Sequence, residues 1–176
     1  YHCIFGGENC FIVHPSDTAP ALVALRASVT IAGPNGRRTV AVENFLMSPS
    51  LDYTRETVLE PTEIVTEILL PPPLEGLRSS YRKVRARRTW DFALAGVALA
   101  IVFTEDQASD SQVVLSGAAP IPWRSAEAEK VVKGSRLDRD RAATAAEAAI
   151  KNAEPMEQNG YKIPLFRGLI EQQLMA

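Results

Sequence analysis

Two cysteines and two histidines near the start of the chain are the residue types best suited to binding a metal ion. They occur as His2-Cys3, Cys10 and His14. Zinc sites usually combine a short Cys-x-x-Cys pair with a second pair of cysteines or histidines at a fixed interval. Neither pair occurs here, and two cysteines are too few for a disulfide framework, which leaves the redox compartment open. The spacing therefore favours ordinary small or surface side chains over a zinc site.

A run of positive charge is the other group with chemical capability. It consists of Arg82, Lys83, Arg85, Arg87 and Arg88. Such a run can contact an anion or a cofactor. Charged residues are also typical of a solvated edge strand, where they discourage pairing with another chain. From composition alone the edge strand is the favoured interpretation, and the cofactor contact is the alternative.

The motifs and the net charge of the whole sequence exclude several classes of function. It contains no P-loop, GxGxxG, GxSxG or HExxH motif, and no carboxylate pair spaced as an acid and a base. The net charge of -2 argues against nucleic acid as the main partner. No stretch approaches the roughly 18 apolar residues of a membrane span, and the start lacks the plan of a signal peptide. Because the chain begins at Tyr1, we expect it to be a piece of a longer protein.

The first half of the chain must position these residues through a helix and three strands. Ser16 or Asp17 can cap a helix that runs to about Ala27, with Pro20 in its first turn. Alternating and β-branched residues predict a hairpin, and a further strand follows it. The predicted strands cover residues 29–31, 39–42 and 63–70, with the hairpin turn at 33–36. The triple proline at 71–73, followed by Gly76, predicts a domain boundary, giving domains 1–75 and 76–176.

The second half predicts a small sheet with a helical cluster behind it. Strands are expected at 80–87, 94–103 and 113–118, and the apolar run of the second suits a strand buried on both faces. Helices are expected from Ser125 to Gly134, from Ser135 or Asp138 to about Asn152, and from Pro164 to Met175. The fold class is therefore α+β, with one or two domains.

Four sequence segments that follow one another in a fixed order resemble a known protein family. They are HPSDTAPALVALRASVTI, RTVAVENFL, EIVTEILLP and YRKVRARRTWDFALAGVALA. The succession resembles the FAD-binding subunit of the xanthine dehydrogenase, aldehyde oxidoreductase and carbon monoxide dehydrogenase family. The resemblance implies the second half of a PCMH-type FAD-binding domain followed by a flavoprotein C-terminal domain, a three-stranded antiparallel sheet plus a helical bundle. The Gly-rich loops that cradle the pyrophosphate in that family would lie upstream of this chain.

The resemblance also implies roles for particular residues. Asp17 matches an aspartate that contacts the flavin nucleotide, although a helix cap is its alternative role. Val65 stands where the family places an aliphatic residue against the isoalloxazine ring, with a plain core position as the alternative. Lys83 matches a lysine near the ring, where a cation can stabilise the charge of the reduced cofactor. Trp90-Asp91 matches a turn that we interpret as structural, with a border of the flavin pocket as the alternative.

The opening YHCIFGGENCFIVHPSD resembles a narrower branch of that family, in which an inserted loop carries a [4Fe-4S] cluster. Thiolates are the usual ligands of such clusters. The resemblance implies that Cys10 is the last ligand, with Cys3 a weaker candidate. The remaining ligands would lie upstream, so the cluster is a prediction about a longer protein.

The resemblance implies an electron relay as the function. A molybdopterin-binding large subunit would oxidise an aldehyde or N-heterocycle, a [2Fe-2S] small subunit would pass the electrons on, and FAD would deliver them to an acceptor. No side chain of this chain is then a catalytic residue. Two other interpretations stay open: a flavin-free assembly module of the same fold, and an unrelated anion-binding protein that uses the basic run. We expect a cytoplasmic protein, or a periplasmic one carried by a partner's export signal.

Overall fold

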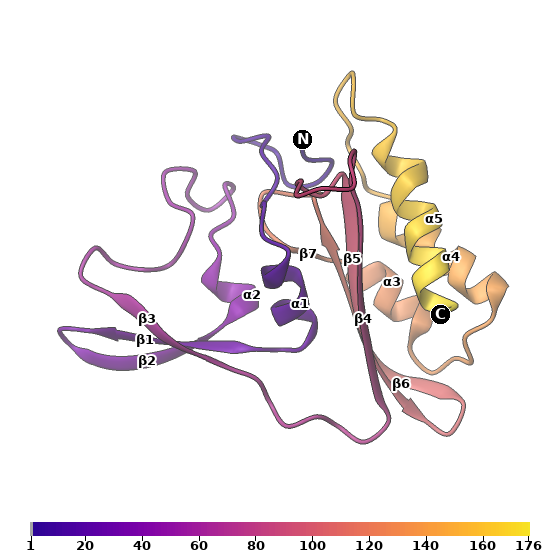
Figure 1. Ribbon diagram of the computed structural model, residues 1–176, viewed down its shortest axis with the longest axis horizontal. Coiled ribbons are helices and arrows are strands. Elements are labelled where there is room, and N and C mark those ends of the chain that lie inside the picture. Colours follow the sequence, from indigo (N-terminus) through magenta and orange to yellow (C-terminus); the bar gives the residue numbers. More distant parts are fainter. Residues whose placement is uncertain (1) are drawn as a thin grey trace.

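The computed structural model describes residues 2–176, which form two antiparallel sheets with helices between and beside them (Figure 1). The smaller sheet has the order β2-β1-β3 and the larger one the order β4-β5-β6-β7. The strands of the smaller sheet are β1 (Ser28–Gly33), β2 (Gly36–Ala41) and β3 (Ile64–Leu69). Those of the larger sheet are β4 (Leu77–Val84), β5 (Ala95–Thr104), β6 (Gln107–Ser116) and β7 (Trp123–Arg124).

Helices cover both faces of the larger sheet. Figure 1 shows α3, α4 and α5 on one side of it, and α1 with the smaller sheet on the other. The helices are α1 (Thr18–Ala24), α2 (Val42–Phe45), α3 (Ala126–Val132), α4 (Arg139–Ile150) and α5 (Lys162–Leu174). None of the helices in residues 2–176 is both long and apolar enough to cross a membrane.

The central strand β5 divides the core in two because its side chains alternate between the faces of the sheet. Val97 and Leu99 point to the cluster formed with α3, α4 and α5. Ala98 and Ala100 point the other way, to the cluster formed with α1 and β1. The apolar run at 94–103 therefore is a strand buried on both faces, as predicted, and α1 packs against the larger sheet.

The smaller sheet is a hairpin with a third strand on its far side. β1 pairs with β2 from Ser28↔Ala41 to Gly33↔Gly36, and with β3 on its other edge. Gly36 has a φ of +107°, a conformation that side chains other than glycine rarely adopt, so it permits the tight turn. The predicted hairpin and the predicted strand at 63–70 are thus confirmed.

The later helices begin with side-chain caps at Ser125 and Asp138, two of the predicted helix starts. The Ser125 hydroxyl accepts a hydrogen bond from the backbone N–H of Ala128 at the start of α3. The Asp138 carboxylate accepts one from the N–H of Arg141 at the start of α4. Such caps satisfy N–H groups that have no partner inside the helix.

Several element boundaries differ from the prediction. α1 ends at Ala24 instead of about Ala27, because Arg26 turns the chain with a φ of +54° and β1 begins at Ser28. β4 begins at Leu77 and ends at Val84, so the residues from Arg85 onward belong to a loop and not to a strand. The short β7 adds a fourth strand beside β6, and the one-turn α2 has no counterpart in the prediction.

Candidate functional site

The register of the larger sheet places Tyr81 and Lys83 on the face covered by α1. In β4, Tyr81 pairs with Ala98 and Lys83 pairs with Gly96. Residues two apart on a strand share a face, as do paired residues on neighbouring strands. Since Ala98 belongs to the cluster formed with α1, Tyr81 and Lys83 lie on that side, towards the start of α1.

Asp17 meets both of these residues from the residue just before α1. Its Oδ2 lies 2.5 Å from the Lys83 Nζ, and its Oδ1 accepts a hydrogen bond of 2.9 Å from the Tyr81 hydroxyl. The Lys83 side chain is only 15% exposed, whereas that of Asp17 is 45% exposed. The structure therefore brings together two of the three cofactor-binding residues that the sequence suggested, 66 positions apart in the chain.

Asp17 is available for these contacts because Ser16 does the capping. The Ser16 hydroxyl accepts hydrogen bonds from the N–H groups of Thr18 and Ala19, at 3.2 and 3.0 Å. The Asp17 side chain makes no capping hydrogen bond. Of the two capping candidates in the sequence, Ser16 therefore holds the helix and Asp17 points to Tyr81 and Lys83.

Gly96 lies beside the ion pair and is closely surrounded by polar side chains. Gly96 stands between Lys83 on β4 and Ser116 on β6, because it pairs with both. A Cβ at Gly96 would lie 2.9 Å from the Ser116 Oγ and 3.2 Å from the Tyr81 hydroxyl. Only glycine leaves room here for the two hydroxyls, which lie 3.3 Å apart.

The Tyr81 phenol stays protonated at all ordinary pH values. Burial raises its pKa to about 12, with the hydrogen bond to Ser116 opposing the shift and the contact with Asp17 adding to it. The Tyr81 hydroxyl is thus a permanent donor that holds the Asp17 carboxylate. We call Asp17, Tyr81, Lys83 and Ser116, gathered around Gly96, the β4–β6 cluster.

The other predicted residues lie outside this cluster. Val65 is on β3, opposite Ile31, and it packs partly buried against the core between the smaller sheet and α1. Trp90 is 90% exposed in the loop after β4, and the Asp91 carboxylate lies 3.5 Å from the Arg87 Nε. Val65 and Trp90 therefore lie apart from the contacts that join Asp17, Tyr81 and Lys83.

The N-terminal segment is tied to the C-terminal half of the chain. The N–H groups of Ile4 and Phe5 both donate to the Ala118 carbonyl, and the Phe5 ring stacks on Trp123 with centroids 4.9 Å apart. The Cys3 thiol is buried, and burial raises its pKa, whereas Cys10 is half-buried. No group of three or more His, Cys, Asp or Glu side chains able to hold a metal ion occurs in residues 2–176. The role of Cys10 as a ligand of a [4Fe-4S] cluster stays a prediction about a longer protein.

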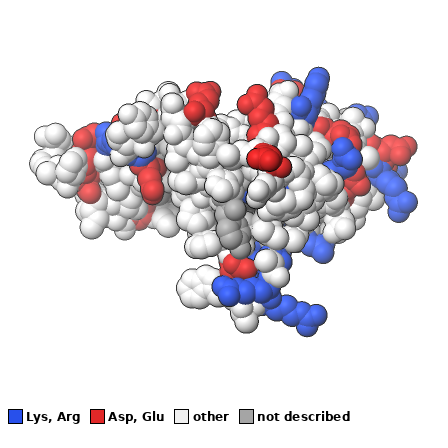
Figure 2. All heavy atoms as spheres, turned by 90° about the horizontal axis from the view of Figure 1, so that it is seen from above, with Lys and Arg blue, Asp and Glu red and all other residues white. Residues whose placement is uncertain are grey.

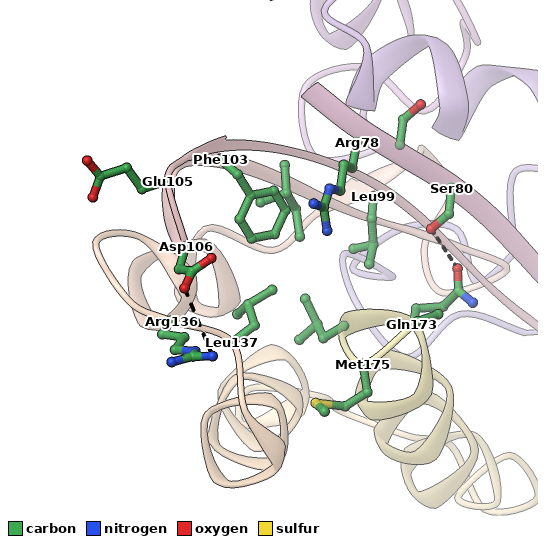
Figure 3. A pocket seen from close by; sticks show the side chains of 14 residues that line it. Arg78, Ser80, Leu99, Phe103, Glu105, Asp106, Arg136, Leu137, Gln173 and Met175 are labelled. Carbon is green, nitrogen blue, oxygen red and sulfur yellow. Dashed lines mark hydrogen bonds and ion pairs between the residues drawn. The ribbon is translucent and has the colours of Figure 1, made fainter. Parts of the chain in front are cut away.

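A separate cavity of about 480 Å³ lies on the opposite face of β4, between the sheet and the end of α5 (Figure 3). Arg78 and Ser80 point into it. Alternate residues of β4 face opposite sides of the sheet, and Tyr81 and Lys83 face the other side. The Arg78 guanidinium lies 4.8 Å from the Phe103 ring centroid, and the Ser80 hydroxyl donates to the Gln173 Oε1 at 2.8 Å. This cavity is separated from the β4–β6 cluster by the sheet.

The β4–β6 cluster offers one cation, one carboxylate and two hydroxyls around a glycine at which a Cβ would be crowded. Such a set suits a ligand that has both hydroxyls and acceptor atoms, and it contains no nucleophile with an adjacent base. The resemblance suggested Asp17 and Lys83, and the sequence analysis gave no role to Tyr81, Gly96 or Ser116. The available signal for Tyr81 was its place two residues before Lys83 in a predicted strand.

Two family models match the chain. Residues 79–175 match the CO dehydrogenase flavoprotein C-terminal domain, and residues 4–73 match the FAD binding domain in molybdopterin dehydrogenase. The FAD-binding subunit PaoB of an aldehyde oxidoreductase from Escherichia coli strain K12 is 34% identical over 94% of this chain and 49% of its own length. The carbon monoxide dehydrogenase medium chain of Hydrogenophaga pseudoflava is 33% identical over 93% of this chain and 56% of its own length.

The solved structures agree with these matches. A carbon monoxide dehydrogenase from Hydrogenophaga pseudoflava that lacks the Mo-pyranopterin moiety of its cofactor superposes with a TM-score of 0.76 and 30% identity. The superposition covers 87% of this chain and 53% of that one. The chain thus spans about half the length of the relatives that it matches.

Proposed function

Because the chain belongs to the family of FAD-binding medium subunits of molybdenum hydroxylases, we propose that it is the C-terminal part of an FAD-carrying electron-transfer subunit. In this role it holds the cofactor that receives electrons from iron-sulfur centres and delivers them to an acceptor. The observation that carries the proposal is the β4–β6 cluster, in which Asp17, Tyr81 and Lys83 converge beside Gly96.

The residues of the cluster fit the chemistry of FAD. The Asp17 carboxylate can accept hydrogen bonds from ribityl or ribose hydroxyls, and the Lys83 ammonium can donate to ring acceptors. The 2.5 Å contact between them holds both in one geometry before any ligand arrives, and a preorganised contact costs less entropy on binding. When bound, FAD supplies the redox chemistry, taking up two electrons and passing them on.

Lys83 and Asp17 together set the charge at the site. Lys83 adds a positive charge that favours the electron-rich state of a neighbouring ring, and Asp17 offsets part of that charge. Tyr81 holds the Asp17 carboxylate in place by donating a hydrogen bond from its phenol, whose pKa burial raises to about 12. The protein therefore orients the cofactor and adjusts its electron affinity, and no side chain of this chain needs to act as nucleophile or base. We propose Val65 as a further contact, an aliphatic wall on β3.

The proposed partners and compartment are those that the family resemblance implies. We propose a molybdopterin-binding large subunit and a [2Fe-2S] small subunit as partners, and aldehydes or N-heterocycles as substrates of that large subunit. We propose the cytoplasm as the compartment, with the periplasm as the alternative if a partner carries an export signal. We also propose 1–75 and 76–176 as the two domains, supported by the two matched ranges.

The test is the visible spectrum of the full-length protein purified with its partners. The proposal predicts flavin bands and a broad iron-sulfur shoulder that both bleach when an aldehyde is added without oxygen. Substituting Lys83→Met should weaken flavin retention, and the neighbouring Arg82→Gln on the opposite face of β4 is the matched control. A full-length protein that stays colourless after FAD is added would contradict the proposal and favour a flavin-free assembly module.

A further inference from the structure

The loop that joins β4 to β5 concentrates charge and an exposed aromatic ring. We call residues 85–92 the basic loop. Within residues 2–176, Trp90 is the most exposed of the large hydrophobic side chains, at 90%. Arg85, Arg87 and Arg88 lie in the same loop, in a chain whose net charge is -2. Figure 2 shows a projection at the lower edge of the molecule on which Lys and Arg side chains gather, with an acidic side chain and uncharged atoms beside them.

Most of this charge is not balanced by carboxylates. Arg87 lies 3.5 Å from Asp91, and Arg85 donates to the Thr89 carbonyl at 3.3 Å. Neither Arg85 nor Arg88 takes part in an ion pair within the described part of the chain. An arginine-rich surface with a solvated tryptophan has the composition of a protein-binding hot spot, because both residue types anchor interfaces.

The basic loop is attached directly to the proposed flavin site. Lys83 and Val84 are the last residues of β4, and the N–H of Leu94 donates to the Val84 carbonyl at 2.9 Å, which closes the base of the loop. A molecule docked on this loop is therefore held next to the proposed flavin site, from which electrons would leave. Positive charge near the site also attracts an acidic partner over several ångströms and speeds its encounter.

We propose that the basic loop docks an acidic redox protein that accepts the electrons, with Trp90 as the anchor and the arginines as the steering charges. This inference rests on the proposed function and names the acceptor class that the family membership leaves open. Oxidation of an aldehyde with water gives a carboxylic acid, two protons and two electrons. Two acceptor proteins each carrying one flavin take one electron and one proton apiece, so the reaction balances.

The experiment uses the full-length protein in complex with its partners and an acidic flavodoxin as the probe. Aldehyde-driven reduction of flavodoxin is compared with reduction of 1,4-benzoquinone, a small neutral acceptor that takes both electrons without docking. The variants are Trp90→Ala and Arg88→Gln. The matched controls are Tyr53→Ala, another well-exposed aromatic at 70%, and Arg141→Gln, an exposed arginine of α4. Binding of oxidised flavodoxin is measured separately by calorimetry.

The proposal predicts at least a tenfold loss of kcat/KM for flavodoxin in Trp90→Ala, with a matching loss of affinity. Arg88→Gln should slow the reaction several-fold at low salt and reduce its dependence on ionic strength. Benzoquinone reduction, flavin content and both controls should stay unchanged. A wild-type complex that reduces benzoquinone but not flavodoxin would overturn the proposal. So would variants that reduce flavodoxin at the wild-type rate, or variants that lose activity with NAD⁺ as acceptor and not with flavodoxin. A complex without flavin contradicts the proposed function itself, so the two failures are distinguishable.

Discussion

Lys162 gives the chain a pH dependence of stability that can be worked out from the structure. Its side chain is completely buried, and its Nζ donates to the carbonyls of His2 and Gly117 at 2.8 and 2.7 Å. No carboxylate pairs with it among residues 2–176. Burial lowers its pKa from 10.5 to about 8, and the nearby Cys3 partly opposes the shift.

The sign of the effect follows from proton binding. Between pH 8 and 10.5 the unfolded chain binds more protons at Lys162 than the folded one, so stability rises with pH across this window. Below pH 8 the folded protein carries the buried ammonium at a cost of about 3.5 kcal/mol, at about 1.4 kcal/mol per pKa unit. From pH 7 to pH 9.5 roughly 2 kcal/mol of that cost is removed.

Replacing Lys162→Met removes the titrating group but leaves two carbonyls without their donor. The loss of the donor costs the same at every pH, at about 1–3 kcal/mol for each buried carbonyl. We therefore expect wild type to gain about 2 kcal/mol of unfolding free energy over Lys162→Met between pH 7 and 9.5. The thiol of Cys3, whose pKa burial raises, is present in both proteins and largely cancels from the comparison.

The assay is urea unfolding of both proteins at a series of pH values, followed by circular dichroism. Lys151→Met is the matched control, since Lys151 is an exposed residue at the end of α4 and should not alter the pH profile. Parallel pH profiles for wild type and Lys162→Met would refute the reasoning, because they would mean that Lys162 titrates alike in the folded and unfolded chains.

Three further substitutions test the packing and the site. Gly96→Ala should lower the FAD affinity of the full-length protein at least tenfold, measured by flavin fluorescence titration, because its Cβ would lie 2.9 Å from the Ser116 Oγ; unchanged affinity would count against the site. Asp138→Ala removes the cap of α4 and should cost about 1 kcal/mol in urea unfolding. Glu129→Gln replaces a nearly buried carboxylate that Arg124 binds through three contacts of 2.8 to 3.1 Å. The substitution should lower the unfolding free energy by about 1–3 kcal/mol in the same assay. An unchanged unfolding free energy would show that the ion pair is not stabilising.

The sequence predicted the elements whose residues carry a local signal. The apolar run at 94–103 indicates a strand buried on both faces whatever its neighbours are, and Ser125 and Asp138 cap helices through contacts within three residues. The hairpin at Gly33 to Gly36 is equally local, since the turn needs glycine at a positive φ. These features depend on short-range chemistry, which a sequence displays directly.

The remaining features depend on contacts between distant segments. The end of β4 at Val84 is set by where Leu94 returns to pair with it, and the basic residues alone favoured a longer strand. The contact of Asp17 with Tyr81 and Lys83 requires α1 to pack on the larger sheet, which no local pattern reveals. Gly96 looks like an ordinary strand residue until β4 and β6 are placed on either side of it. Resemblance suggested two members of the cluster, and the sheet register supplied the rest.

The central claim is that the β4–β6 cluster adjoins the flavin and sets its electron affinity. The most direct measurement is the reduction potential of FAD in the full-length protein, determined by spectroelectrochemistry for wild type, Lys83→Met, Asp17→Asn and Arg82→Gln. Removing the cation should lower the potential by about 30 mV or more, since 30 mV corresponds to about 1.4 kcal/mol for two electrons. Asp17→Asn should raise it, and Arg82→Gln, on the other face of β4, should leave it unchanged. Equal potentials in Lys83→Met, Asp17→Asn and wild type would contradict the account.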